Sequence, residues 1–527
     1  MDITSFGELK NAIENANDGD VLDLNVINDL LFTSTVVISR SLTIHIANGS
    51  GGNEVILSFI LGGNFRHFTT NPTGAAALAD VPNISMTVGE GVVLNGNNAS
   101  GGIGFNSSGG QLILEGCSII NCVTSGSGVA GNGGGLWVGG NTANCTLHMR
   151  DVRIANCTAN NGGGGLFMNG NAVCMMNNGE ISGNTASADN SNGGGVYVFG
   201  DTNSFAMNGG TIRNNTASNG GGVFILNGIF TMSGNASIRD NTASNSAGNA
   251  GNGGGVYNLG GRLTMNDGEI IGNSTARIGG GVRNHGASAV FDMHGGEISG
   301  NTSVGDAGGG VTNISGATFN LHDGKISGNT SAVFSGGGIN NQASTLVMTG
   351  GEISGNLASS GGGVLNWSNA RFTMEGGSIA DNRTFAAEGR GGGVFNFGPA
   401  TFTMSGGTIS GHTTASYGGG INNTGADAFV TIGSGTICNN TAIVDGGGVW
   451  SEHASLANLV VEPGALFSNN SASRAFSRNP IDDELYFTHI LGTRWTSPFT
   501  QGYNNYDISS INGTPFVLPA VAVANMG

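Results

Sequence analysis

The stretch "GGTIRNNTASNGGGVF", residues 209–224, recurs in variants along most of the chain. Three consecutive glycines begin at or near residues 133, 163, 193, 220, 253, 279, 308, 336, 361, 391, 418 and 446, a mean spacing of about 28 residues. Each triplet is followed by Val, Leu or Ile, then by a segment such as "FTM", and then by one such as "GGEISGN". Apolar and polar residues alternate within these segments, and a period of two residues indicates β-strands.

The repeat predicts an all-β fold, a right-handed parallel β-helix with three strands in each turn of about 28 residues. Helical solenoids need runs of good helix formers, which these units lack. In a parallel β-helix each strand pairs with its counterpart one turn later, about 4.8 Å away, so equivalent positions become columns. We assign residues 21–475 to the β-helix and residues 476–527 to a C-terminal cap and tail.

Residues 1–20 differ from the repeats and predict an N-terminal capping helix. Ser5 precedes Glu8 by three residues, which is the spacing of a capping box. Phe6, Leu9 and Ile13 fall on one helical face. A helix here would close the open end of the coil, where an uncovered strand layer invites aggregation.

The amino-acid composition and net charge limit the classes of partner that the protein can bind. The chain has 527 residues, 99 glycines, 17 basic and 34 acidic residues, and a net charge of −17. This balance disfavours nucleic acid and anionic membrane surfaces, and the apolar run in the tail is too short to insert into a membrane. No metal-ligand spacing or dinucleotide fingerprint occurs, so we expect no metal and no cofactor. Residues 1–20 carry no signal-peptide pattern.

One corner of the turn carries a polar column that we interpret as a structural asparagine ladder. Asn tolerates left-handed backbone, and its amide can bond to the amide of the next turn. The column comprises Asn184, Asn215, Asn241, Asn273, Asn301, Asn329, Asn356, Asn382, His412, Asn440 and Asn469. The column begins with Cys122 and Cys157 on successive turns. These two cysteines could lie close enough to form a disulfide, or they could stack as a pair of buried free thiols.

A second asparagine column lies two residues beyond the valine that follows each triplet. It comprises Asn258, Asn284, Asn313, Asn341, Asn366, Asn396 and Asn423. Earlier turns hold Val138, Met168, Val198 and Ile225 at this position, so that corner should be drier near the N-terminal side.

The strand after each glycine triplet has two residues that point into the core. Because side chains alternate along a strand, the residue between these two points to solvent. In five successive turns it is aromatic: Trp137, Phe167, Tyr197, Phe224 and Tyr257. We expect an exposed stripe that either stabilises the sheet by cross-strand packing or binds sugar rings or an apolar partner. The same position then changes to Arg283, Thr312 and Asn340, which favours a local binding site.

Catalysis is the weaker alternative. Cleavage of an acidic polysaccharide needs clustered carboxylates with a basic residue, or two carboxylates at a fixed separation. The column Glu180, Glu269, Glu297 and Glu352 is interleaved with Thr, Ser and Lys, which indicates a solvated face. We therefore expect no catalytic residues.

The helix with "NDGD", the "GGxIxxN…GGGV" turns and the closing "SPFTQGYNNYDI" resemble β-helix regions of large adhesin-like surface proteins of Gram-positive gut bacteria. Their fold resembles that of pectate lyases. The "GG-x-I" motif is also similar to that of chlamydial polymorphic outer membrane proteins, although their "FxxN" motif is not regular here. The resemblance implies export, display at the bacterial cell surface and attachment.

We therefore expect a rigid extracellular rod that binds a glycan or a host surface protein along the aromatic stripe. The alternatives are a structural stalk or fibre subunit that binds nothing specific, and a polysaccharide lyase or glycoside hydrolase. The alternating tail segment "TPFVLPAVAVA" predicts possible end-to-end self-association.

Overall fold

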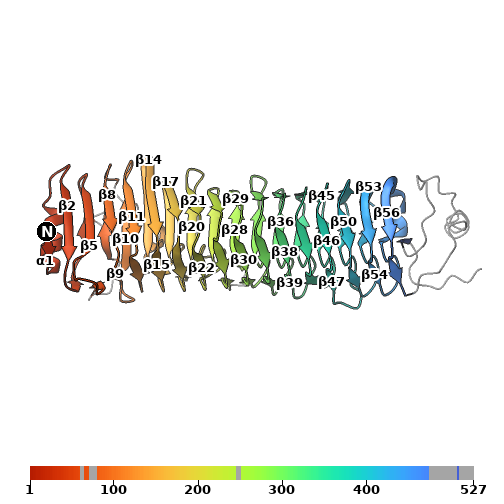
Figure 1. Ribbon diagram of the computed structural model, residues 1–527, viewed down its shortest axis with the longest axis horizontal. Helices are drawn as coiled ribbons and strands as arrows, with labels where there is room; N and C mark the ends of the chain where they lie inside the picture. Colours follow the sequence, from red (N-terminus) through yellow and green to blue (C-terminus); the bar gives the residue numbers. More distant parts are fainter. Residues whose placement is uncertain (60–64, 71–79, 245–250, 474–506, 510–527) are drawn as a thin grey trace, which may run out of the picture. The chain divides into compact units, whose positions relative to one another are not determined.

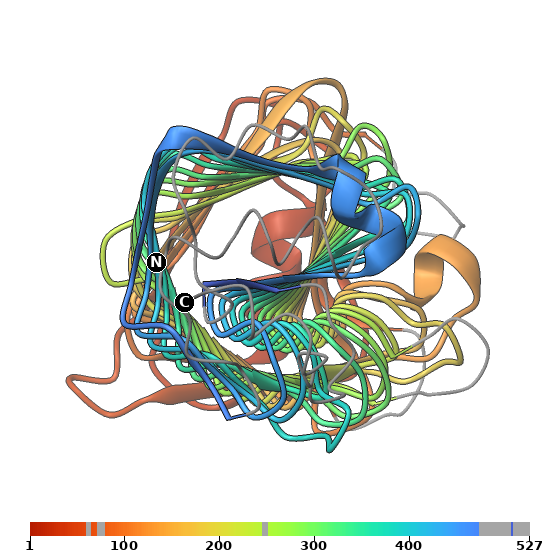
Figure 2. The same ribbon diagram turned by 90° about the vertical axis from the view of Figure 1, so that its right-hand side faces the viewer.

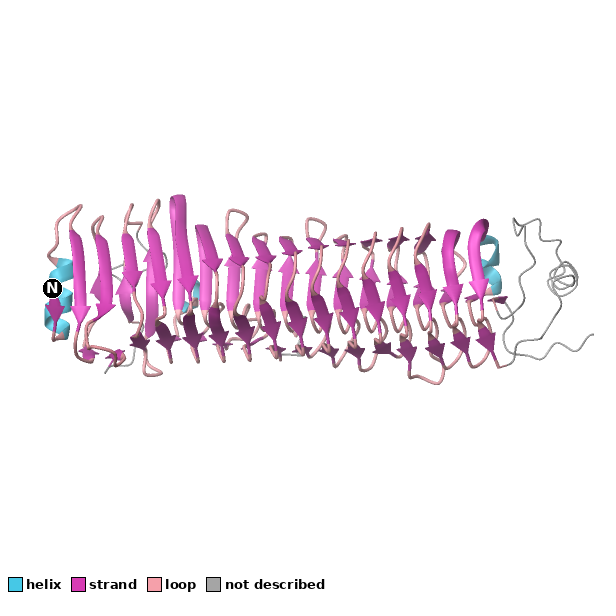
Figure 3. Ribbon diagram, in the orientation of Figure 1, coloured by secondary structure: helices cyan, strands magenta, loops and turns pink. Residues whose placement is uncertain are grey.

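The computed structural model describes residues 1–59, 65–70, 80–244, 251–473 and 507–509. It confirms an all-β parallel solenoid of about 15 turns, with about 28 residues in each turn and about 4% helix. The chain forms two compact units, Met1–Val333 and Phe334–Gly527. Strands of successive turns lie side by side (Figures 1 and 3), and the view along the coil shows them one behind another within each unit (Figure 2).

In the first unit the strands form four parallel stacks, each strand pairing with its counterpart in the next turn. The first stack follows the glycine triplets and comprises β4 (Val36–Val37), β7 (Arg66–Thr69), β10 (Gly101–Asn106), β14 (Leu136–Arg150), β17 (Leu166–Met176), β20 (Val196–Phe199), β24 (Val223–Leu226), β28 (Val256–Leu259), β32 (Val282–His285) and β36 (Val311–Ile314).

The second stack carries the "FTM" segments. It comprises β1 (Asp2–Ile3), β2 (Val21–Val26), β5 (Thr43–Asn48), β8 (Ser85–Val88), β11 (Gln111–Glu115), the C-terminal halves of β14 and β17, β21 (Ser204–Met207), β25 (Ile229–Met232), β29 (Arg262–Met265), β33 (Val290–Met293) and β37 (Thr318–Leu321).

The third stack carries the "GGEISGN" segments. It comprises β3 (Leu30–Phe32), β6 (Val55–Phe59), β9 (Val92–Asn95), β12 (Ser118–Ile120), β15 (Val152–Ala155), β18 (Gly179–Ser182), β22 (Thr211–Arg213), β26 (Ser237–Arg239), β30 (Glu269–Ile271), β34 (Glu297–Ser299) and β38 (Lys325–Ser327).

The turn also holds a short strand beyond the three that the sequence predicts. It follows each residue of the ladder column, Cys122 and Cys157 included, and forms a separate sheet: β13 (Val123–Thr124), β16 (Thr158–Ala159), β19 (Thr185–Ala186), β23 (Thr216–Ala217), β27 (Thr242–Ala243), β31 (Ser274–Thr275), β35 (Thr302–Ser303) and β39 (Thr330–Ser331).

The second unit repeats the same four stacks. The first stack comprises β40 (Ile339–Gln342), β44 (Val364–Trp367), β48 (Val394–Phe397), β52 (Ile421–Thr424), β55 (Val449–Ser451) and β58 (Ile508–Ser509). The second stack comprises β41 (Thr345–Met348), β45 (Arg371–Met374), β49 (Thr401–Met404), β53 (Phe429–Cys438) and β56 (Leu459–Ser468), and the third comprises β42 (Glu352–Ser354), β46 (Ser378–Ala380) and β50 (Thr408–Ser410) with the C-terminal halves of β53 and β56. The fourth stack comprises β43 (Leu357–Ala358), β47 (Arg383–Thr384), β51 (Thr413–Thr414), β54 (Thr441–Ala442) and β57 (Ser471–Ala472). Apart from β58, the predicted tail lies outside the described residues, so its self-association stays a prediction.

The capping helix is present as α1 (Phe6–Glu14), with the predicted capping box between Ser5 and Glu8. Leu9 and Ile13 are buried, and the Phe6 ring lies 4.6 Å from that of Phe32. Seen along the coil, α1 lies across the interior of the outline (Figure 2). Two 3-10 helices, η1 (Gly128–Gly131) and η2 (His453–Asn458), interrupt later turns.

The asparagine ladder is confirmed. Each Nδ2 donates to Oδ1 one turn later, at 2.9–3.0 Å from Asn184 through Asn215, Asn241, Asn273 and Asn301 to Asn329. Cys157 begins this series by donating its backbone N–H to Asn184 Oδ1, and both Cys122 and Cys157 are free, buried thiols rather than a disulfide. Burial raises the pKa of the Cys122 thiol well above its usual range.

In the second unit the ladder runs from Asn356 through Asn382 and His412 to Asn440. The next rung is Asn470, which accepts from Asn440 at 3.0 Å, so the predicted rung Asn469 is wrong by one residue. Asn469 instead takes the left-handed backbone conformation, with φ +55°. The second asparagine column is also confirmed. Hydrogen bonds of 2.8–2.9 Å join the side-chain amides of successive turns from Asn258 to Asn313 and from Asn341 to Asn423.

Candidate functional site

The five predicted aromatic residues form one continuous column on the outer side of the first stack. Their neighbours Val196 and Val198 are fully buried in the interior, as the alternation requires. Ring centroids of successive members lie 4.9–6.1 Å apart, and three of the four contacts are edge-to-face: Trp137, Phe167, Tyr197, Phe224 and Tyr257. The structure therefore brings the predicted residues together in the predicted order.

The expected exposure of this column is wrong, because the rings are only 2–7% exposed. At Tyr197 the chain before a glycine triplet folds against the ring. A Cβ on Gly162 would lie 2.6 Å from Cδ1 of the Tyr197 ring, so the ring occupies space that any other residue would need. Alternation sets the side of a strand from which a residue projects, but not what covers that side.

An arginine lies at each end of the ring column, with Arg283 buried and Arg66 half-buried. The Arg283 guanidinium lies 4.6 Å from the centroid of the Tyr257 ring, within cation–π distance. At the other end, Arg66 extends across Gly104, which pairs in register with Trp137. Arg66 donates from Nη1 and Nη2 to the backbone oxygens of Gly133 and Asn132, each at 2.8 Å. Each arginine therefore fixes one end of the packed column.

Solvent reaches the next outward position of the same strands, which the sequence reasoning missed. This position holds Phe199, Leu226 and Leu259, and the two leucines pack against the ring column. Phe199 is 38% exposed, and the centroid of its ring lies 5.7 Å from that of Tyr197 and 6.2 Å from that of Phe167. The signal was present, because alternation that turns Tyr197 outward also turns Phe199 outward.

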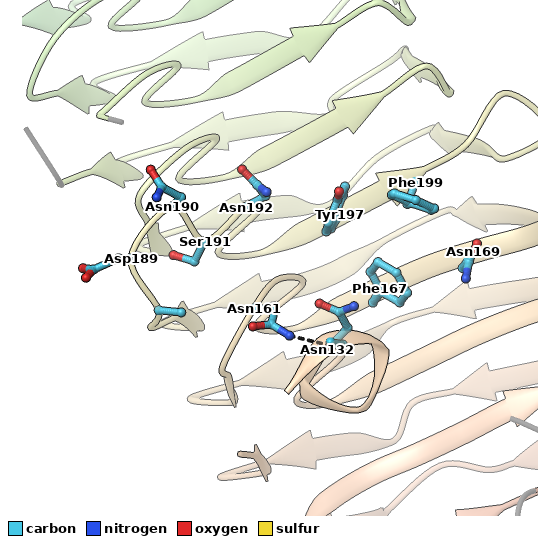
Figure 4. Close-up of a pocket in the computed structure, with 12 residues that line it drawn as sticks. Asn132, Asn161, Phe167, Asn169, Asp189, Asn190, Ser191, Asn192, Tyr197 and Phe199 are labelled. Atoms are coloured by element: carbon cyan, nitrogen blue, oxygen red, sulfur yellow. Dashed lines mark hydrogen bonds between the residues drawn. The ribbon is translucent and has the colours of Figure 1, made fainter. Parts of the chain in front are cut away.

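An open hollow of about 340 Å³ lies beside these rings. Its apolar wall consists of Phe167, Tyr197 and Phe199 from β17 and β20 (Figure 4). The remaining lining is largely amide and hydroxyl, from Gly128, Asn132, Asn161, Asn169, Ala188, Asp189, Asn190, Ser191 and Asn192. Of the predicted site residues, Phe167 and Tyr197 line the hollow, and Trp137, Phe224 and Tyr257 do not.

Local bonding shapes the polar wall. Asn161 Nδ2 donates to the backbone oxygen of Gly128, which holds η1 against the next turn. Ser191 Oγ donates to Ala186 O at 2.7 Å, and Asn190 takes the left-handed conformation with φ +63°. These contacts shape the loop before β20, which contributes residues 189–192 to the lining of the hollow.

Burial governs the titratable groups of the ring column. It raises the pKa of the Tyr197 and Tyr257 hydroxyls, and the Arg283 charge opposes this increase at Tyr257. The Tyr257 hydroxyl lies 2.7 Å from Nδ1 of His285. Burial and the Arg283 charge lower the pKa of His285 to about 4, so this imidazole is neutral at pH 7. Asp189 is the sole Asp, Glu, Lys, Arg or His side chain in the lining of the hollow.

Other charged groups are paired on the surface or scattered. Glu180 binds Arg213 at 2.9 Å, and Glu269 accepts from Ser237 at 2.8 Å. Within the described residues, no group of three or more His, Cys, Asp or Glu side chains could hold a metal ion. The same part of the chain contains no helix that is long and apolar enough to cross a membrane.

Comparison of the chain with protein-family models, with curated proteins and with solved structures gave no match. The functional argument therefore depends on the geometry of this hollow and on the motifs of the sequence.

Proposed function

We propose that this protein is a carbohydrate-binding β-solenoid that acts as an adhesin outside the cell, with the hollow beside Phe199 as its binding site. One observation carries the proposal: a partly exposed aromatic ring stands in an open hollow whose opposite wall is rich in amides. Rings stack on the apolar faces of sugars, while a few well-placed polar groups bond to their hydroxyls. The volume of about 340 Å³ lies within the range of small-molecule sites.

The site is smaller than the stripe that the sequence suggested. A sugar would contact Phe199 and the accessible edges of Phe167 and Tyr197, and the other three rings would serve as packing behind it. Attachment at the cell surface is supported by the resemblance of the "GG-x-I" and "GGGV" turns to those of adhesin-like proteins.

Replacing Phe199 with Ser tests the proposal. We expect the variant to lose binding to glycans that the parent protein captures on an array, by about tenfold or more in Kd, because sugar stacking loses its exposed ring. Its circular dichroism spectrum and thermal midpoint should match those of the parent protein, since Phe199 is 38% exposed.

Phe397→Ser is the matched control. Phe397 ends β48 as Phe199 ends β20, and it is 42% exposed, but it does not line the hollow. This variant should bind glycans as the parent does. Unchanged binding by Phe199→Ser, or an equal loss in both variants, would contradict the proposal.

A structural stalk is the second candidate, and the burial of the five rings favours it. Edge-to-face packing at 2–7% exposure stabilises a sheet without any ligand. A stalk predicts that the intact chain captures no glycan and no host protein on an array. Capture of a host protein without any glycan would replace the carbohydrate assignment.

A further inference from the structure

A third asparagine column runs along the edge of the hollow. It occupies the residue before each glycine triplet, where successive turns are joined by parallel bridges: Asn132, Gly162, Asn192, Asn219 and Asn252. Asn252 Nδ2 donates to Asn219 Oδ1 at 2.9 Å, and Asn219 Nδ2 donates to Asn192 Oδ1 at 3.3 Å. Asn252 and Asn219 thus both donate toward the preceding turn.

The column is interrupted at Gly162, which has no side chain to continue it. On one side of the gap, Asn192 Nδ2 finds no acceptor among the described residues, although its Oδ1 is satisfied. On the other side, Asn132 Oδ1 is buried without any hydrogen-bond partner in the part of the chain that the structure describes. Asn132 as a whole is 8% exposed. Asn132 and Asn192 both line the hollow (Figure 4).

Packing around Gly162 and Asn132 fixes this interruption of the asparagine column. Gly162 admits the Tyr197 ring, which lies against its Cα and forms part of the apolar wall. Arg66 holds the Asn132 backbone through the 2.8 Å bond to its carbonyl oxygen. An unpaired buried acceptor destabilises the free protein, so a ligand that donates to Asn132 Oδ1 would relieve a cost that is already present before binding.

We infer that the hollow recognises the acetamido group of an N-acetylhexosamine, an inference that rests on the carbohydrate-binding function proposed above. A trans secondary amide is planar, and its N–H and C=O point in opposite directions. Its N–H can therefore donate toward Asn132 Oδ1 while its C=O accepts from Asn192 Nδ2, so that the group bridges the two amides from the side of the hollow. The acetyl methyl group then faces the rings of Phe167 and Tyr197.

The charge of the lining agrees with an uncharged ligand. Asp189 is the one Asp, Glu, Lys, Arg or His side chain in it, and the chain as a whole carries a net charge of −17. A uronic acid or a sulfated sugar would bring a like charge to this site without a cation to pair with it. We therefore expect acidic sugars to bind more weakly than N-acetylhexosamines.

The test is calorimetric titration of the full chain with chito-oligosaccharides and with cello-oligosaccharides of equal length, which differ by acetamido for hydroxyl at C2. We expect the N-acetylated series to bind at least about tenfold more tightly, because a site built to pair an amide rejects an analogue that leaves its groups unpaired. Asn132→Ala should remove most of this preference by weakening only the N-acetylated series.

Asn192→Ala provides a second, independent variant, and it should lower the preference in the same way. Asn252→Ala is the matched control, because Asn252 belongs to the same column and donates to Asn219, but neither contacts Asn192 nor lines the hollow; its preference should equal that of the parent protein. Equal affinity of the parent for both series would overturn this inference and leave the proposed function standing. Failure to bind either series or any other glycan would overturn both.

Discussion

At the scale of single residues, the buried corners depend on side chains that both donate and accept. Asparagine satisfies this requirement at most rungs, and His412 satisfies it at one. His412 Nδ1 accepts from the backbone N–H of Asn382 at 3.0 Å, and Nε2 donates to Ile379 O at 3.0 Å. These partners require the neutral tautomer that carries its proton on Nε2.

We expect acid to destabilise the protein through His412. Complete burial lowers its pKa from 6.5 to about 4, so between these pH values the unfolded chain binds a proton that the folded chain does not. The free energy of unfolding is then fully retained above about pH 6.5. It falls as pH decreases and levels off below about pH 4, a loss of about 3 kcal/mol from this group.

His412→Asn is the informative variant, because it places in this position the residue found at the neighbouring rungs. Thermal midpoints measured from pH 7.5 to pH 3.5 should fall less steeply for the variant than for the parent protein. Parallel pH profiles for the two proteins would show that His412 contributes nothing to acid sensitivity. His67, whose pKa burial also lowers to about 4, should account for part of the fall that remains.

At the scale of elements, the strand β24 shows what the aromatic column does for the fold. The Phe224 side chain is 3% exposed, and the centroid of its ring lies 5.1 Å from that of Tyr197 and 4.9 Å from that of Tyr257. We expect Phe224→Ser to lower the free energy of unfolding by about 3 kcal/mol or more, because it leaves a cavity and places a hydroxyl among rings. Denaturant unfolding followed by circular dichroism would measure the loss.

Phe199→Ser is the comparison for this element, since the same substitution at a ring that is 38% exposed should cost far less. Equal stability of the two variants would mean that Phe224 is not packed as described. A variant with both Tyr197 and Phe224 replaced by Ser would lose stability as well as any ligand contact, because both rings are buried. The single Phe199 variant is therefore the better probe of function.

The elements also show how far the sequence could predict the structure. The strand stacks, the ladder columns and the capping box of Ser5 and Glu8 follow from periodicity and spacing, which act within a few residues of the chain. The cover over Tyr197 comes from the loop around Gly162, one turn earlier, and no local pattern reveals that contact. The unpaired Asn132 and Asn192 amides likewise depend on which residues three consecutive turns place side by side.

At the scale of the whole molecule, the repeat architecture makes most contacts local. Each turn pairs with the turn before it and the turn after it, and stability in such arrays is close to a sum of turn and interface terms. A defect should therefore loosen its own neighbourhood well before it unfolds the chain. The ladder allows a direct test, because its bonds connect successive turns of one unit.

We expect Asn301→Ala to produce a local defect within the first unit. The change removes Oδ1, which accepts from both the backbone N–H and Nδ2 of Asn273 at 2.9–3.0 Å, and it removes the donor to Ile270 O. Unsatisfied buried groups cost about 1–3 kcal/mol each. Hydrogen–deuterium exchange followed by mass spectrometry should accelerate in peptides covering residues 270–330, while peptides covering residues 366–440 keep their parent rates. Asn266→Ala, at an exposed position of the preceding turn, should leave both regions unchanged. Uniform acceleration along the chain in Asn301→Ala would show that the turns unfold together, and that the ladder acts on the molecule as a whole.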